Sequence, residues 1–104
     1  MRILKHVVMW RFLDEAEGRT KSENMKFAAD NLRALVGVAP TLLALRIGED
    51  ELHSPASYDM CLICDFADLE GMLAYRDFPQ HRAVSAYIGK VTYARVVSDF
   101  FVEE

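Results

Sequence analysis

The chain has 104 residues and a mass of 11.8 kDa; 52% of its residues are hydrophobic, and its net charge is −4 at pH 7. These values describe a single small domain, residues 1–104, with enough apolar material for one core, and they exclude a disordered chain. The acidic balance disfavours general binding to nucleic acid or anionic membranes. The apolar run Val7-Val8-Met9-Trp10 is too short for a signal peptide or a membrane helix, so we expect a cytoplasmic protein.

The first two thirds of the chain predict three strands and one helix. Residues 4–13 alternate as a strand, one face of which carries Leu4, His6, Val8, Trp10 and Phe12. Thr20 and Glu23 form a capping box that begins a helix, whose apolar positions recur through Val36 before Gly37 and Pro40 end it. Residues 41–49 and 58–66 predict two further strands, with a loop between them.

The last third of the chain predicts two short helices and a final strand. Asp68 caps a helix that runs to about Arg76, and Pro79 suits the first turn of the next one. One face of that second helix carries His81, Val84, Ile88 and Val91. Residues 93–102 complete the order β-α-β-β-α-α-β. This order predicts an α+β, ferredoxin-like fold, in which a four-stranded antiparallel sheet has all its helices on one face.

Apolar side chains on both faces of the predicted sheet indicate a partner. The first strand places Val7 and Met9 on one face and Val8 and Trp10 on the other. A sheet face without helices that is nonetheless apolar usually marks an interface. We therefore expect a homodimer, a dimeric α/β barrel, that buries Val7, Met9 and Val97 between two sheets. The alternative is a sheet with scattered surface hydrophobes.

The two cysteines occur as Cys61-Leu-Ile-Cys64, which superficially resembles a redox or zinc motif. Within a strand, however, residues three apart point to opposite faces with Cα atoms about 10 Å apart, too far for a disulfide. No second cysteine pair completes a zinc site. We expect two reduced thiols on opposite faces of one strand.

Two histidines and a tyrosine are the candidates for chemistry. His6 interrupts an apolar strand face, His81 is the third residue of a predicted helix, and Tyr75 lies on the inward side of the helix before it. Two imidazoles and a phenol in an apolar pocket can transfer protons near neutral pH. The alternative is that they are hydrogen-bonded core residues. No third potential ligand accompanies the two histidines, so we expect no metal site. His53 lies in a polar loop and is not a candidate for chemistry.

Several segments together resemble one family, the stress-responsive A/B barrel (Dabb) domain. They are residues 5–12 (KHVVMWRF), 37–40 (GVAP), 58–66 (YDMCLICDF) and 74–81 (AYRDFPQH), and the likeness spans nearly the whole chain. The resemblance implies a ferredoxin-like dimeric α/β barrel. Many such proteins have no known activity, and one is a cofactor-free polyketide cyclase.

Two functional interpretations follow from this resemblance. In the first, His6, Tyr75 and His81 match the cyclase's catalytic residues and act without metal or organic cofactor on a small hydrophobic carbonyl compound. The substrate pocket then contains Trp10, Met72, Val84 and Ile88. In the second, the domain is a non-catalytic, stress-related binding or oligomerisation module. Phe78 and Leu32 differ from the cyclase pattern. A weaker third interpretation, haem binding or cofactor-free monooxygenase activity, comes from the wider dimeric α/β-barrel superfamily.

Overall fold

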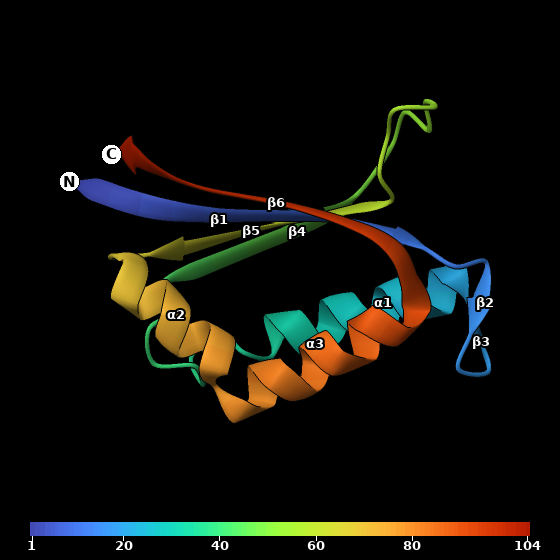
Figure 1. Cartoon of the computed structure of the whole chain (residues 1–104), viewed down its shortest axis with the longest axis horizontal. Helices are drawn as coiled ribbons and strands as arrows, with labels where there is room; N and C mark the ends of the chain where they lie inside the picture. The colour runs from blue at the N-terminus through green and yellow to red at the C-terminus, as the bar shows by residue number, and fades with distance from the viewer.

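Four main strands, a short hairpin and three helices make up the chain, which the computed structural model describes in full, residues 1–104. In chain order the elements are β1 (Arg2–Phe12), β2 (Glu15–Ala16), β3 (Arg19–Thr20), α1 (Lys21–Arg33), β4 (Ala44–Glu49), β5 (Met60–Phe66), α2 (Leu69–Asp77), α3 (Pro79–Val91) and β6 (Thr92–Glu103). The main sheet is antiparallel with the strand order β4-β5-β1-β6. All three helices lie on one face of it, and both termini lie at the same end (Figure 1). This is the predicted ferredoxin-like arrangement.

The strand register decides which side chains share the helix-covered face. His6 on the central strand β1 pairs with Cys64 on β5 and with Asp99 on β6. Residues paired across antiparallel strands point to the same side of the sheet. Cys64 is fully buried, so this side is the one that faces the helices. The register therefore places His6 and Asp99 beneath the helices.

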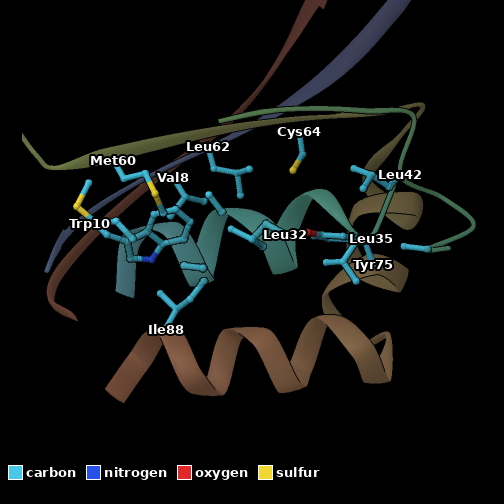
Figure 2. Close-up of a cluster of buried hydrophobic side chains, with 14 of the residues drawn as sticks. Val8, Trp10, Leu32, Leu35, Leu42, Met60, Leu62, Cys64, Tyr75 and Ile88 are labelled. Atoms are coloured by element: carbon cyan, nitrogen blue, oxygen red, sulfur yellow. The ribbon is translucent and has the colours of Figure 1, made fainter. Parts of the chain in front are cut away.

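A core of buried side chains fills the space between the sheet and the helices. Figure 2 shows side chains of the strands reaching toward those of the helices, among them Val8, Trp10, Met60 and Leu62 from the sheet and Leu32, Tyr75 and Ile88 from the helices. Burial of such side chains stabilises a fold by roughly 1.5–3 kcal/mol each. The elements that carry the candidate residues are thus fixed by packing.

Local sequence signals set the helix boundaries that position these residues. Thr20 and Glu23 form the predicted capping box at the start of α1, each side chain accepting a hydrogen bond from the other's backbone N–H. Asp68 caps α2 by accepting from the Gly71 N–H at 2.8 Å. Phe78 ends α2, and Pro79 opens α3 because its fixed φ suits a first turn. This junction brings Tyr75 and His81 close together on successive helices.

Several boundaries differ from the sequence prediction. α1 ends at Arg33 rather than Val36, β4 begins at Ala44 rather than Thr41, and β5 begins at Met60 rather than Tyr58. The hairpin β2–β3 was not predicted. Its turn residues Glu17 and Gly18 have φ values of 53° and 75°, a left-handed conformation that two-residue hairpins require.

We call the face of the sheet without helices the outer face: Lys5, Val7, Met9 and Arg11 on β1, Arg46 on β4, Cys61, Ile63 and Asp65 on β5, and Val96, Ser98 and Phe100 on β6. Met9, Val96 and Phe100 are exposed there.

The sequence analysis predicted that Val97 lies on the outer face, and this prediction was wrong. Val97 pairs with Val8 and points to the helix side, because the alternation along β6 puts Val96, not Val97, opposite Met9.

The two cysteines are free and lie on opposite faces of β5, as predicted. Cys64 is buried under the helices, whereas Cys61 pairs with Met9 on the outer face. Burial raises the pKa of the Cys64 thiol to about 12 and also raises that of Cys61. Neither thiol is therefore activated as a nucleophile.

Candidate active site

A cavity of about 420 Å³ lies between the helix-covered face of the sheet and helices α2 and α3. Its lining combines buried apolar side chains with polar ones: His6, Val8, Trp10, Leu32, Leu62, Met72, Tyr75, Arg76, His81, Ser85, Ile88, Gly89, Thr92 and Arg95. Apolar cavities of this size with a few converging polar groups are the usual form of a small-molecule site. His6, Tyr75 and His81 all line this one cavity.

His6 is oriented by a carboxylate. Its Nδ1 lies 2.6 Å from Oδ1 of Asp99, on the neighbouring strand, and donates to it. The Nε2 atom of the ring makes no hydrogen bond to the protein. A carboxylate that accepts from one imidazole nitrogen fixes the orientation of the ring. Nε2 of His6 is therefore the ring nitrogen that is free to contact a bound molecule.

His81 is held in its neutral form. Burial lowers the pKa of this imidazole, and the positive charges of His6 and Arg95 lower it further, against an opposing hydrogen bond to the backbone. In that bond, Nδ1 donates to the carbonyl oxygen of Arg76 at 3.2 Å. The Nε2 lone pair thus has no protein partner. A neutral imidazole with a free lone pair is the form that a general base requires.

Tyr75 supplies a protonated phenol beside His81. The two rings lie 4.3 Å apart between centroids, and Phe66 lies 5.2 Å from Tyr75 on the other side. Burial raises the pKa of the phenol above its usual value, as does the nearby Cys64 thiol. The buried hydroxyl makes no hydrogen bond within the chain. Because an unsatisfied buried hydroxyl costs about 1–3 kcal/mol, this group is a candidate donor to a bound molecule.

The structure brings together all but one of the residues that the sequence assigned to the site. Trp10, Met72 and Ile88 line the cavity with the three candidate catalytic residues. Val84, which we also assigned to the pocket, is not among the lining residues and packs against the core. At about 100° per residue, the side of α3 that faces the cavity runs through His81, Ser85 and Ile88.

Three charged residues at the site were not predicted: Asp99, Arg95 and Arg76. Asp99 and Arg95 lie on the helix side of β6, opposite His6 and Trp10. Alternation along β6 groups the two with each other, but only the register with β1 shows that they face the helices. Arg76 follows Tyr75 in the last turn of α2. A basic residue is common at that position of a helix, so the sequence did not distinguish it.

Other kinds of site find less support in the geometry. No group of three or more His, Cys, Asp or Glu side chains is placed to hold a metal ion. No helix has the length and apolar character needed to cross a membrane. The candidate residues line a cavity with two imidazoles, a phenol and an apolar floor, and imidazole and phenol groups are able to transfer protons.

The chain is a ferredoxin-like domain with a cavity beneath its helices, and comparison with known proteins identifies the family. The model of the stress-responsive A/B barrel domain (Dabb) matches residues 4–102. The chain belongs to this family, as its motifs indicated. No curated protein matches the chain.

Solved structures share the fold over nearly their whole length. A dimeric ferredoxin-like protein of unknown function from Thermobifida fusca is 25% identical, with a TM-score of 0.82 over 97% of this chain and 92% of the other. A Dabb family protein from Mesorhizobium loti is 17% identical, with a TM-score of 0.72 over 96% of each chain. A hydroxynitrile lyase from Passiflora edulis is 16% identical, with a TM-score of 0.80 over 98% of this chain and 94% of the other.

Proposed function

We propose that this protein is a cofactor-free enzyme of the cyclase or isomerase type that moves a proton on a small hydrophobic carbonyl compound. The observation that carries the proposal is the convergence of His6, Tyr75 and His81 on one largely apolar cavity. Two further features support it. His81 has a lowered pKa and a free lone pair, and the Tyr75 hydroxyl has no partner.

Each residue has a distinct role in this proposal. Nε2 of His81 removes a proton from the carbon next to the carbonyl, and the electron pair of that C–H bond forms the enolate. The ring of His6, which Asp99 orients, donates a hydrogen bond from protonated Nε2 to the developing oxyanion. Tyr75 donates from its protonated hydroxyl and orients the substrate. The proton then returns from His81 to another atom of the product.

The similar structures support an enzyme without specifying its substrate. The Passiflora edulis protein is a hydroxynitrile lyase, which shows that a chain with this fold can be an enzyme. At 16% identity the likeness concerns the fold alone. The proposal for this chain therefore depends on its own cavity.

We further propose that a second copy of the chain covers the outer face. Met9, Val96 and Phe100 are exposed on it next to half-buried Val7 and Ile63. An apolar sheet face of this kind usually marks an interface. The similar Thermobifida fusca protein is a dimer. The cavity lies on the opposite face of the sheet, so a second copy on the outer face does not cover it.

Hydrogen–deuterium exchange on a model substrate tests the proposed reaction. Nonane-2,4-dione has an apolar tail and an enolisable carbon between two carbonyls, and NMR in D₂O measures exchange at that carbon. We expect the wild-type protein to accelerate exchange over buffer, and His81→Ala to lower the protein-catalysed rate about 100-fold or more. His53→Ala is the matched control, because His53 is an exposed histidine in a loop outside the cavity.

The same experiment distinguishes the alternative interpretation. If His81→Ala and His53→Ala exchange the probe equally fast, the imidazole in the cavity is not a base. The protein would then be a binding or oligomerisation module in which the histidines only satisfy hydrogen bonds. Circular dichroism of both variants confirms that the comparison is made between folded proteins.

A further inference from the structure

The cavity changes character from its floor to its rim. Its deepest lining residues are apolar and almost fully buried, with Val8, Leu32 and Leu62 at 1–2% exposure. The lining side chains that are exposed are polar: Arg76, Ser85 and Arg95. A molecule that fits this gradient has a hydrocarbon body and a polar end directed outward.

The charged side chains at the rim, Arg76 and Arg95, are both positive. No aspartate or glutamate lines the cavity, although the chain carries a net charge of −4. The nearest acid on the same face of β6, Asp99, is engaged by His6. Arg76 lies 3.6 Å from Asp77, whereas Arg95 has no acidic partner within ion-pair distance. Arg95 is thus an uncompensated cation at the mouth of an apolar cavity.

From this arrangement we infer that the natural ligand is an amphipathic organic acid, whose carboxylate binds Arg95 at the rim and whose hydrocarbon body occupies the floor. A guanidinium presents its N–H groups in a planar fork that matches a carboxylate. One uncompensated arginine balances the single charge of a carboxylate. The inference rests on the proposed function, since it names the substrate class of the same cavity: a carbonyl compound that also carries a carboxylate.

Calorimetry with a matched pair of probes tests this inference apart from the reaction. 4-Butylbenzoate has the predicted shape and charge, and it has no enolisable hydrogen beside its carboxyl group, so it binds without reacting. 4-Butylbenzamide has nearly the same shape and no charge. At about pH 7.5, where His81 is neutral, we expect the wild-type protein to bind the acid about ten-fold more tightly than the amide.

Variants of Arg95 connect that preference to one side chain. Arg95→Gln should weaken binding of the acid about ten-fold and leave binding of the amide unchanged. Arg95→Lys keeps the charge and should keep part of the preference. Arg82→Gln is the control, because Arg82 is an exposed arginine of α3 that does not line the cavity.

Three results would overturn the inference: no binding of the acid to the wild-type protein, equal affinity for acid and amide, or an unchanged preference in Arg95→Gln. None of these depends on catalysis. The exchange experiment on nonane-2,4-dione uses a neutral probe, so the proposed proton transfer can fail while the carboxylate preference stands, and the reverse.

Discussion

The two faces of the sheet use similar side chains for different purposes. On the helix-covered face, apolar residues such as Val8 and Leu62 are buried within the chain, and polar groups such as His6 have partners in a cavity. On the outer face, Met9, Val96 and Phe100 are exposed, and the Lys5–Asp65 ion pair at 2.8 Å lies beside them, with Lys5 directly opposite Phe100.

Both faces of the sheet carry apolar side chains, so apolar content alone does not distinguish a core from an interface. The inner face is covered by helices of the same chain, so its stability is independent of protein concentration. The outer face lacks a cover within the chain, so in our proposal its stability depends on a second copy. Substitutions on the two faces should therefore differ in how their effects depend on protein concentration.

Truncating a phenylalanine on each face gives the sharpest contrast in stability. Phe66 on the inner face is fully buried between His6 and Tyr75. Phe66→Ala should lower the free energy of unfolding by about 3–5 kcal/mol because it leaves a cavity in the core. Urea denaturation at several protein concentrations measures this loss, which should be similar at each concentration.

Phe100→Ala is the matched substitution on the outer face, where Phe100 is 44% exposed. Its effect should be smaller and should shrink as the protein is diluted and dissociates, because the substitution acts only on the associated protein. Equal losses for the two variants at all concentrations would mean that the faces do not differ in the way proposed.

A charge placed on the outer face tests the dimer directly. Met9→Asp puts a carboxylate among apolar side chains, and an unpaired charge buried at an interface costs about 2–5 kcal/mol. We expect light scattering to give a mass near 24 kDa, twice the 11.8 kDa chain, for the wild type, and an unfolded or aggregated protein for Met9→Asp.

Leu52→Asp serves as the control for that substitution, because Leu52 is 80% exposed in a loop outside the sheet. It should leave the mass unchanged. A wild-type mass near 12 kDa at micromolar concentration would contradict the proposed partner.

The two cysteines report on the two faces from one strand. Cys64 is fully buried and the pKa of its thiol is about 12, so alkylation should require unfolding. Cys61 is half-buried on the outer face and should react faster once the dimer dissociates. Mass spectrometry of timed alkylation with and without dilution measures both rates. A disulfide between the two thiols, or faster reaction at Cys64, would contradict the assignment of faces.

Much of this arrangement could be predicted from local sequence, because the signals involved are local. The capping box at Thr20, the Pro79 junction and the alternation along β1 depend on a few neighbouring residues, and each is present in the structure. His6 and His81 were found because an imidazole stands out on an otherwise apolar face.

The remaining features depend on contacts between distant segments. The face to which Val97 and Asp99 belong is set by the pairing of β6 with β1, which includes an irregularity between Arg11 and Phe12. A shift of one residue reverses every assignment on a strand. The misplacement of Val97 and the missed carboxylate at His6 have this same cause.

The smallest expected effect is the pH dependence that His81 contributes to stability. Its pKa in the folded protein is below the usual 6.5, so the unfolded chain binds a proton more readily as the pH falls through 6.5 toward the folded value. The contribution is therefore constant above this window and is lost within it, by no more than about 1.4 kcal/mol for each pH unit. Urea denaturation between about pH 7.5 and 5 should show a shallower decline for His81→Gln than for the wild type. A steeper decline of the free energy of unfolding for His81→Gln than for the wild type would mean that folding raises, rather than lowers, the pKa of His81.

In the proposed reaction His6 from the sheet and His81 from α3, which line one cavity, act as a unit in proton transfer. The most direct measurement is the deuterium exchange rate of nonane-2,4-dione for the wild type, His6→Ala, His81→Ala and the double variant. Residues that act together are not additive, so each single variant should lose nearly as much as the double variant, about 100-fold or more. A wild-type rate no faster than that of the double variant, with both proteins folded and dimeric, would contradict the account.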